Sequence, residues 1–457
     1  MAKLISTNPS NYEILGEVET STEKEIQDKV KKAHASQKEW HSIGLSRRIE
    51  FLKSLLPLFT LQKEKLALLA SREMGMPHSQ AIDDVNSGIE YFSWYLENAE
   101  QYLKPEVTFE DENEIHKVIY EPKGVVVVIV PWNFPFSNFI WQVGQNLIVG
   151  NTVVFKHSEE TQLFGKEIEK IFADSKVPSG VFSEVYGDGK VGDMLVHQDI
   201  NMICFTGSSK VGKQLYKIGA EKFIPVLMEL GGSAPGIVFE DADVDKVIES
   251  IYFNKFLNCG QVCDGLKRLI VHESKFDEVV EKLKRIVESK KIGVAEDKET
   301  EIGPLVAKRQ LELLQKQVED AISKGAEVIT GGKTPENLKG AFYVPTLITK
   351  VSRDMRVWQE EMFGPVLPIV SFKTYDEAIE LANDTKYGLG SYIFTEDKQK
   401  FEKASVEIKT GMVSHNNVIY LKPCNPFGGN KDSGLGREHG KYGFHELCQI
   451  KIIAMEK

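Results

Sequence analysis

The chain has 457 residues, of which 42% are hydrophobic and 27% are charged, as in ordinary globular proteins. This length exceeds that of one ordinary domain, so two or three domains are expected. The 67 acidic residues outnumber the 56 basic residues, which gives a net charge of −11. Nucleic-acid and anionic-membrane surfaces require clustered positive charge, so this balance argues against both kinds of partner.

The sequence shows no signal for export, for a membrane span or for a metal site. Its first residues, MAKLISTNPS, lack the apolar region of a secretory signal. The longest apolar run, residues 125–130, is far shorter than the roughly 20 residues of a membrane helix. The five cysteines are sparse and lack paired spacing, which favours a reducing cytoplasmic compartment. No His or Cys cluster completes a zinc set near Cys259 and Cys263.

Helices are expected over the first hundred residues. Thr22 and Glu25 have the spacing of a capping box in front of an amphipathic stretch. Two further periodic stretches follow, at residues 47–74 and 81–103. The short alternating pattern of residues 105–120 then predicts an exposed hairpin outside the core.

From Gly124 onward, strand-like and helical segments alternate. The run VVVVIV is typical of a strand that is buried on both faces of a parallel sheet. A first set of expected strands lies at residues 125–130, 152–155, 181–187, 202–207 and 226–232. A second set lies at residues 235–241, 268–273, 326–330 and 366–372. Alternation of this kind with short glycine-rich joints predicts two doubly wound α/β domains.

Two glycine-rich joints compete as phosphate-binding sites. FTGSSKVGKQ comes within one residue of the triphosphate loop GxxxxGK[ST], but Gln214 stands where that loop needs a hydroxyl for Mg²⁺. YGDGKVG matches GxGxxG at residues 187–192, yet the acid expected about 20 residues later is missing. The turn at Gly207 and Ser208 leads into a helix N-terminus, whose free N–H groups suit a diphosphate. We therefore favour that turn and interpret residues 187–192 as a structural turn.

Three residues are candidates for chemistry on their local context alone. Cys263 follows a polar loop that could expose its sulfur and lower its pKa, although a lone cysteine is more often a small core residue. Asn133 lies in the stiff loop PWNFP, where its amide could brace the loop or donate to a developing oxyanion. Glu229 ends an apolar strand, where a carboxyl group would have a raised pKa and could act as a base.

Six motifs occur in the order found in the NAD(P)-dependent aldehyde dehydrogenase superfamily, which the chain resembles over nearly its whole length. They are PWNFP, FTGS, ELGG, GQVC, EEMFGP and PFGGNKDSGLGRE. Among its branches, the sequence is most similar to compact bacterial succinate-semialdehyde dehydrogenases. The resemblance implies a Rossmann-like cofactor domain, a catalytic domain and a small β oligomerisation arm.

The resemblance also implies a division of the chain. Residues 1–103 and 123–231 would form the NAD(P)-binding domain, and residues 232–440 the catalytic domain. Residues 104–122 and 441–457 would supply strands that join subunits into a homodimer or homotetramer.

The resemblance assigns roles to individual residues. Cys263 would be the nucleophile, Glu229 the general base, and Asn133 with the backbone N–H of Cys263 the oxyanion hole. Lys156 and Glu159 would hold the adenosine ribose of the cofactor. The other residues expected around NAD or NADP are Trp132, Gly207, Ser208, Glu361 and Phe363.

The implied reaction is the oxidation of an aldehyde to a carboxylic acid through a cysteine thiohemiacetal and a thioester. One alternative is a dehydrogenase that passes the acyl group to CoA, which would be expected to lack the base at Glu229. The other is a non-catalytic protein on the same scaffold, against which Cys263, Asn133 and Glu229 argue together.

The substrate positions depart from the succinate-semialdehyde pattern. Such enzymes would be expected to carry arginines six residues after PWNFP and six before the nucleophile, where this chain has Trp141 and Leu257. Without bidentate donors a carboxylate has no clear partner, so an uncharged aldehyde fits at least as well as a semialdehyde. Asn416 is expected on a loop that lines the substrate entrance.

The residues beside the expected ribose site predict a preference for NAD over NADP. A carboxylate at Glu159 that faces the ribose 2′-OH would repel a 2′-phosphate, although Lys156 and Ser158 could still accept NADP. We expect a higher kcat/KM for NAD than for NADP with the same aldehyde, measured as the rate of formation of the reduced cofactor. A higher value for NADP would contradict the role given to Glu159.

Overall fold

The valine-rich run forms the centre of a six-stranded sheet in the computed structural model, which describes residues 2–457. The strands of this sheet are β5 (Val125–Ile129), β6 (Thr152–Lys156), β7 (Phe182–Glu184), β8 (Met202–Thr206), β9 (Val226–Glu229) and β17 (Gly434–Leu435). Their order is β17-β9-β8-β5-β6-β7, and only β17 is antiparallel to its neighbour. This confirms the predicted parallel sheet.

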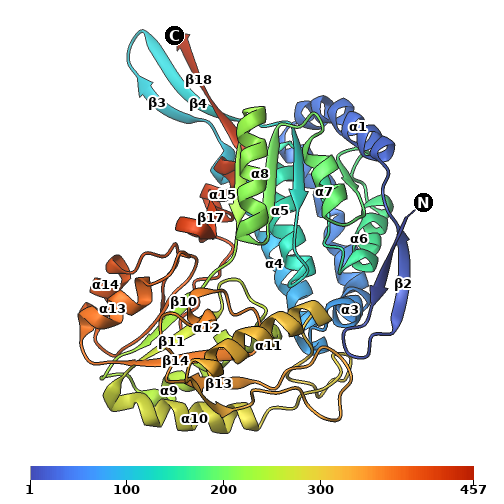
Figure 1. Cartoon of the computed structure of the whole chain (residues 1–457). Helices are drawn as coiled ribbons and strands as arrows, with labels where there is room; N and C mark the ends of the chain where they lie inside the picture. The colour runs from blue at the N-terminus through green and yellow to red at the C-terminus, as the bar shows by residue number, and fades with distance from the viewer. Residues whose placement is uncertain (1) are drawn as a thin grey trace.

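Helices cover both faces of this sheet (Figure 1). They are α1 (Glu23–Ser42), α2 (Leu45–Lys53), α3 (Leu55–Met74), α4 (His78–Leu103), α5 (Pro135–Val149), α6 (Gln162–Asp174), α7 (Gly189–Val196), α8 (Ser209–Lys222) and α15 (Gly440–Glu446). Successive side chains of a strand point to opposite faces. Accordingly, Val126 and Val128 join the core under α3 to α6, and Val125 and Val127 join the core under α1, α7 and α8.

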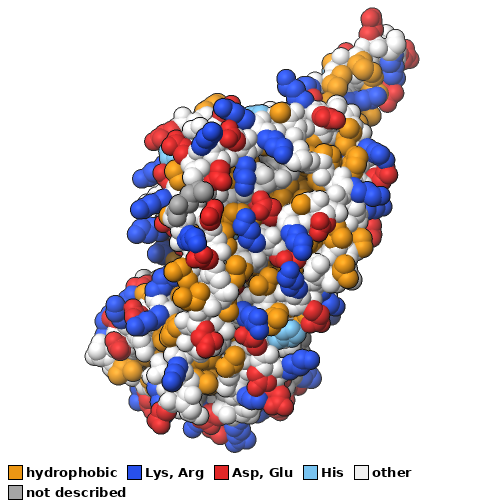
Figure 2. Space-filling view, turned by 90° about the vertical axis from the view of Figure 1, so that its right-hand side faces the viewer, with side chains coloured by type: hydrophobic (Ala, Val, Ile, Leu, Met, Phe, Trp, Pro, Cys, Tyr) orange, Lys and Arg blue, Asp and Glu red, His pale blue; other side chains and the backbone are white. Residues whose placement is uncertain are grey.

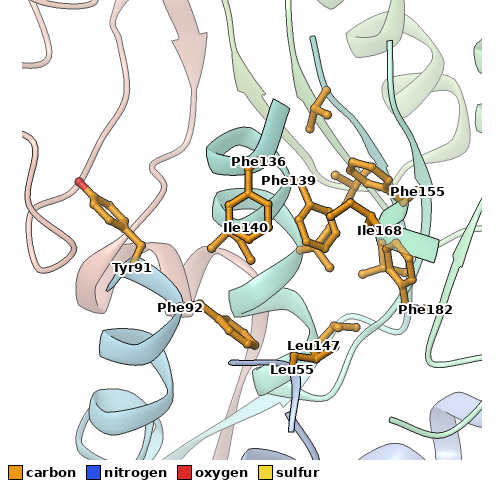
Figure 3. Close-up of a cluster of buried hydrophobic side chains, with 14 of the residues drawn as sticks. Leu55, Tyr91, Phe92, Phe136, Phe139, Ile140, Leu147, Phe155, Ile168 and Phe182 are labelled. Carbon is orange, nitrogen blue, oxygen red and sulfur yellow. The ribbon is translucent and has the colours of Figure 1, made fainter. Parts of the chain in front are cut away.

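Aromatic rings fill the first of these cores. Phe139 from α5 lies edge-on to Phe155 of β6 and Phe182 of β7, with ring centroids 5.3 and 5.8 Å away. Figure 3 shows these rings packed together, with Tyr91 at the border of the cluster and its hydroxyl directed away from them. Edge-to-face contacts of this kind stabilise a core beyond the area they bury.

A second, seven-stranded sheet forms the other domain. Its strands are β10 (Ala234–Val238), β11 (Leu266–His272), β12 (Glu327–Thr330), β13 (Thr346–Thr349), β14 (Val366–Phe372), β15 (Tyr392–Phe394) and β16 (Ser414–His415), in the order β12-β13-β14-β11-β10-β15-β16. Its helices are α9 (Val244–Phe256), α10 (Phe276–Glu288), α11 (Lys308–Ser323), α12 (Arg356–Gln359), α13 (Tyr375–Asn383) and α14 (Lys398–Glu407). All strand pairs except β12–β13 are parallel, which confirms the second α/β domain.

A three-stranded antiparallel arm projects from the first domain (Figure 1). It consists of β3 (Glu106–Glu110), β4 (Glu114–Pro122) and the C-terminal strand β18 (Cys448–Glu456). β18 pairs with β4 over its whole length, from Cys448 opposite Pro122 to Glu456 opposite Glu114. The predicted exposed hairpin is therefore confirmed, and the last strand joins it.

The N-terminus differs from the expected helix. Lys3–Thr7 and Ile14–Glu19 form an antiparallel pair, β1 and β2, on either side of a turn at Asn8. The Asn8 carbonyl accepts from the N–H of Tyr12 (2.7 Å). The first helix begins at Glu23, where Thr22 and Glu25 form the predicted capping box.

The end of the second domain also differs from the expected boundary at residue 440. By Gly434 the chain has returned to the first sheet, where β17 pairs with β9. The following helix α15 then packs against α4 and α5 rather than joining the arm. Short segments of this kind carry no periodic pattern, so the sequence alone does not reveal them.

No helix within residues 2–457 has the length and apolar character needed to cross a membrane.

A buried carboxyl group holds the N-terminus of α5. Asp84 on α4 accepts from the N–H groups of Phe136 and Ser137, both at 3.1 Å, and the Ser137 hydroxyl donates to the Asp84 carbonyl at 3.2 Å. Burial raises the pKa of Asp84 to about 6. Because the loop that contains Asn133 leads directly into α5, this cap also positions that loop.

Replacement of Asp84 should destabilise the fold through this helix end. We expect Asp84→Ala to lower the free energy of unfolding by about 1–3 kcal/mol, since it leaves two buried N–H groups without an acceptor. Urea unfolding followed by circular dichroism measures this. The control is Asp83→Ala, an exposed position on the same helix, which should change the stability by less than about 0.5 kcal/mol. Equal effects of the two substitutions would contradict the capping role.

Candidate active site

Cys263 lies on a strained loop between the short helix η1 (Leu257–Gly260) and β11. Asn258 and Cys259 have left-handed backbone angles, with φ of 49° and 56°. Each such residue costs roughly 1–3 kcal/mol unless its surroundings hold it there. A Cβ at Gly260 would lie 2.2 Å from the carbonyl oxygen of Gly364, so only glycine fits at this contact. The nucleophile loop is thus held against the EEMFGP segment.

Asn133 connects the first domain to this loop. Its side-chain nitrogen donates to the carbonyl of Gln261 (3.0 Å), and its own carbonyl accepts from the side chain of Asn258 (2.7 Å). The amide of Asn138 donates to Asn133 Oδ1 (3.2 Å), which sets the orientation of the group. An amide nitrogen carries two hydrogens, so one is left for an oxygen bound beside Cys263.

Glu229 ends β9, and its side chain is tightly enclosed. The residue is 2% exposed, and a Cβ at Gly428 would lie 2.6 Å from its Oε1. Neither carboxyl oxygen has a hydrogen-bond partner within residues 2–457. Burial and then the charge of Glu438 raise the pKa of Glu229 well above 4.5, while Arg437 opposes the shift. The predicted raised pKa is confirmed, and a raised pKa makes the carboxylate a stronger base.

The expectation of a lowered thiol pKa at Cys263 is wrong for this structure. The thiol is half-buried, and burial raises its pKa well above 9.0. The charges of Asp264, Glu361 and Glu229 add to this rise, and Lys267 opposes it. The loop context indicated a polar surrounding but not the burial of the thiol, which has the largest effect, and it did not show the approach of Glu361 and Glu229.

The predicted phosphate and ribose residues lie along one edge of the first sheet. Lys156 ends β6, and Gly207 and Ser208 follow β8, so all three stand at the carboxyl ends of parallel strands, where α/β sheets bind ligands. Ser208 caps α8, and its hydroxyl accepts from the N–H of Val211 (3.4 Å). Lys213, the lysine of the apparent triphosphate loop, instead pairs with Asp432 at 2.6 Å.

Lys156 and Glu159 offer a donor and an acceptor side by side. The buried Lys156 ammonium donates to the carbonyl of His157 (3.0 Å), and burial lowers its pKa while Glu159 opposes this. Glu159 itself is exposed. At the other glycine joint the predicted turn is correct only for Gly187 and Asp188, because α7 already begins at Gly189, where Asp188 caps it by accepting from the N–H of Lys190 (2.9 Å).

Glu361 and Phe363 approach the same edge from the second domain. Glu361 Oε1 accepts from the N–H of Gly232 (3.1 Å), and a Cβ at Gly231 would lie 2.4 Å from its other oxygen. The ring of Phe363 meets Trp132 of the first domain edge-on, with centroids 5.6 Å apart. The structure therefore brings together cofactor residues that are predicted from both domains.

The predicted substrate residue Trp141 belongs to an aromatic group. Its ring centroid lies 5.4 Å from that of Tyr91 and 5.5 Å from that of Phe427. The indole N–H of Trp141 and the hydroxyl of Tyr91 are buried without a hydrogen-bond partner in residues 2–457. Leu257 is half-buried at the start of η1. Unpartnered donors in an aromatic setting are typical of a ligand site.

Asn416, the third predicted substrate residue, is occupied by a structural contact. Its amide oxygen accepts from the N–H of Thr395 and its nitrogen donates to the carbonyl of Thr395, both at 3.0 Å. The residue of this loop that packs beside Cys263 is Tyr420, whose hydroxyl donates to Asp264 (2.9 Å). No group of three or more metal-ligating side chains occurs in the part of the chain that is described, residues 2–457.

Comparison with known proteins decides the family. The sequence matches the Aldehyde dehydrogenase family over residues 2–453. The chain belongs to the aldehyde dehydrogenase family. It is therefore an NAD(P)-dependent oxidoreductase of aldehydes, as predicted, and the non-catalytic alternative is set aside.

Two curated relatives of this aldehyde dehydrogenase differ in their substrates. The chain is 37% identical to the mitochondrial succinate-semialdehyde dehydrogenase of Oryza sativa subsp. japonica, with 98% of the chain and 85% of the relative covered. It is 35% identical to the chloroplastic betaine aldehyde dehydrogenase of Beta vulgaris, with 98% and 92% covered.

Solved structures of the family share its fold. An E. coli NADP dependent enzyme superposes with a TM-score of 0.96 at 32% identity, covering 100% of this chain and 95% of that one. The NAD+ complex of the Bacillus cereus aldehyde dehydrogenase also gives a TM-score of 0.96 at 32% identity, covering 100% and 93%. The neighbours thus include proteins described with each cofactor.

The sequence analysis missed Glu438, the last residue of the PFGGNKDSGLGRE motif. Glu438 is buried and accepts a hydrogen bond from Gln142, and its charge raises the pKa of Glu229. Burial raises its pKa to about 8. An acid inside a glycine-rich motif was the available signal. Its partner could not be read from sequence because Glu229 lies 209 positions earlier, on a strand that β17 joins only in the fold.

Removal of the thiol should abolish turnover and leave cofactor binding intact. We expect Cys263→Ser to lower kcat by at least about 1,000-fold, because the hydroxyl is a much weaker nucleophile in this setting. The dissociation constant for NADH, measured by fluorescence titration, should stay within about twofold of the wild-type value, since the cofactor residues are unchanged. The control is Cys424→Ser at an exposed cysteine, which should retain activity. Near-normal turnover of Cys263→Ser would contradict the assignment.

Proposed function

We propose that Cys263, Asn133 and Glu229 oxidise an aldehyde and release the product by hydrolysis. The observation that carries this proposal is the setting of Glu229, a buried carboxyl group with a raised pKa and both oxygens free, in the same site as the thiol. A base of this kind is needed to activate water. A transfer to CoA needs no such base, so Glu229 favours water as the acceptor.

The first step is addition of the Cys263 sulfur to the carbonyl carbon of the aldehyde. A C–S bond forms, and the carbonyl electron pair moves to the oxygen as a negative charge. The side-chain N–H of Asn133 and the backbone N–H of Cys263 donate to that oxygen. Each donor of such an oxyanion hole lowers the activation barrier by about 3 kcal/mol. The bracing of Asn133 by Gln261 and Asn138 supports this role, because preorganised donors need no reorientation during the reaction.

The tetrahedral carbon then loses its hydrogen with the bonding electron pair, which leaves a thioester on Cys263. The chemistry that bound NAD(P) supplies here is acceptance of that hydride. Lys156 and Glu159 would hold its adenosine ribose, Gly207 and Ser208 its diphosphate, and Glu361 its nicotinamide ribose. The ring contact between Trp132 and Phe363 would border the nicotinamide.

Glu229 completes the reaction by accepting a proton from water as that water attacks the thioester. The acid leaves, and the sulfur of Cys263 is restored. The position of Glu229 at the end of β9 supports this role, because the tight approach of Gly428 limits how the carboxyl group can move.

The lining of the substrate side favours an aldehyde without a carboxylate at its far end. Trp141, Tyr91 and Phe427 present aromatic surface, and Leu257 adds an apolar side chain. Aromatic faces attract apolar groups and cations, whereas their negative quadrupole repels a carboxylate. On this basis we expect the charge of the substrate to resemble that of betaine aldehyde, named for one relative, rather than that of succinate semialdehyde, named for the other.

We also propose a homodimer or homotetramer assembled through the arm. Its strands expose Val107, Phe109, Ile450 and Ile452, and Figure 2 shows hydrophobic side chains along the projecting arm. An isolated arm of three strands with apolar residues in water favours association with another chain.

All five cysteines are unpaired, which supports the proposed cytoplasmic location.

Substitution of the base should separate the two halves of the reaction. We expect Glu229→Gln to give a burst of about one NADH per active site, followed by a steady rate at least about 100-fold below that of the wild type. In the wild type, lowering the pH protonates Glu229 and removes the base. Because the pKa of Glu229 is raised, the steady rate begins to fall at a pH above the usual range near 4.5. The amplitude of the burst should then persist while the steady rate falls, and the burst itself should become slower because the raised thiol pKa makes the Cys263 thiolate rarer at low pH. Stopped-flow absorbance measures both phases. An undiminished steady rate of Glu229→Gln would remove Glu229 from the role of base.

A further inference from the structure

Asp264 is a buried carboxyl group beside the nucleophile that the reaction described above does not use. It is 5% exposed, and its Oδ1 lies 3.9 Å from the sulfur of Cys263. Its other oxygen accepts from the Tyr420 hydroxyl (2.9 Å), and its backbone carbonyl accepts from the Tyr392 hydroxyl (3.0 Å). The carboxyl group is therefore held in one orientation, with one oxygen directed at the thiol.

The charge of Asp264 has no close positive partner in residues 2–457. Buried carboxylates in proteins are normally paired with a cation, because desolvation of an unpaired charge is costly. The positive group that acts on Asp264 is Lys267, but its ammonium donates to the carbonyl of Gly260 (3.1 Å) and lies over the Phe363 ring. The direct partners of the carboxylate are thus a phenol and a thiol.

The same charge opposes the chemistry in the free enzyme. Of the charged groups that raise the thiol pKa of Cys263, Asp264 has the largest effect, ahead of Glu361 and Glu229, with Lys267 acting in the opposite direction. A carboxylate here therefore disfavours the thiolate that must attack the aldehyde. Such a residue becomes favourable once a positive charge sits against it.

We propose that Asp264 is a specificity residue whose Oδ1 binds an ammonium group carried by the aldehyde near its carbonyl carbon. This inference rests on the proposed function, because it places the aldehyde carbon on Cys263. An amine on the third carbon of such an aldehyde stays close to the sulfur and therefore to Oδ1. The charge of Asp264 also acts on the phenol of Tyr91, whose ring and that of Trp141 line the substrate side and can face a cation.

Binding of the ammonium would also assist the nucleophile. The positive charge offsets that of Asp264, so beside burial only the charges of Glu361 and Glu229 still oppose the thiolate of Cys263, and Lys267 favours it. The proton that leaves the sulfur passes to solvent, and no further group is oxidised or reduced. A hydroxyl group at the same place would donate a hydrogen bond without offsetting the charge, which is why we assign an ammonium group.

The test compares three aldehydes of similar shape: 3-aminopropanal, 3-hydroxypropanal and butanal, each with saturating NAD. We expect the wild type to have its highest kcat/KM with 3-aminopropanal. Asp264→Asn should lower the ratio of 3-aminopropanal to butanal by about 10- to 100-fold, the usual loss for a hydrogen bond between charged groups. The kcat/KM for butanal should stay the same or rise. The matched control is Glu90→Gln, which removes an exposed carboxylate that acts on Tyr91 but does not adjoin the thiol, and should keep the ratio.

Alkylation of the thiol provides a second readout without substrate. Iodoacetamide should modify Cys263 faster in Asp264→Asn than in the wild type at pH 8, because the opposing charge is gone. If Asp264→Asn fails to fold, Tyr420→Phe keeps the charge but removes the bond that orients it, and should lower the same substrate ratio in part.

Several results would overturn the inference. They are an equal loss for 3-aminopropanal and butanal in Asp264→Asn, an equal change of the ratio in Glu90→Gln, a wild type that uses 3-hydroxypropanal as well as 3-aminopropanal, and slower alkylation of Asp264→Asn. If the wild type oxidises butanal but shows no preference for the amine, the role of Asp264 fails and the proposed function stands. If it oxidises none of these aldehydes but oxidises succinate semialdehyde, the proposed substrate class fails as well.

Discussion

The hydrogen bonds between Asn133 and the nucleophile loop join the two domains at the point where bonds are made and broken. Asn133 belongs to the first domain. Asn258 and Gln261 belong to the second domain and lie shortly before Cys263 and β11. The loop that they hold has a strained backbone and packs against Gly364 without room for a side chain. Its geometry therefore depends on both domains being folded and in contact.

That constraint explains how residues far apart in sequence form one site. The capped N-terminus of α5 places the Asn133 loop, β9 ends at Glu229, and β17 returns the chain to the same strand. Each of these devices fixes one side chain relative to Cys263. Stabilising contacts outside the site thus set the distances on which the reaction depends.

Negative charge is the second property of the site. Glu229, Glu361 and Glu438 all have pKa values raised by burial, and Asp264 does too. Such an arrangement makes Glu229 a stronger base, but it also disfavours the thiolate of Cys263 until positive charge enters. Both the oxidised nicotinamide and, in our proposal, the substrate ammonium supply that charge. The site is therefore suited to ligands that carry positive charge.

The sequence predicted the features that local pattern determines. The run at residues 125–130 predicted a strand buried on both faces, and the six motifs directed attention to Cys263, Glu229 and the expected cofactor residues. It could not predict contacts that arise only when distant segments meet. The burial of the Cys263 thiol, which contributes most to the rise of its pKa, is one example, and the approach of Tyr420 rather than Asn416 is another. The two-residue strand β17 is too short to show any periodicity.

The central claim is that Cys263 carries an acyl group that Glu229 releases to water. Mass spectrometry of Glu229→Gln, mixed with butanal and NAD and digested at low pH, tests this most directly. Our account predicts a butanoyl group on the peptide that contains Cys263, absent when NAD is omitted, and no such group on the wild-type enzyme after turnover. An acyl group found on Cys424 instead, or none on any peptide although NADH has formed, would contradict it.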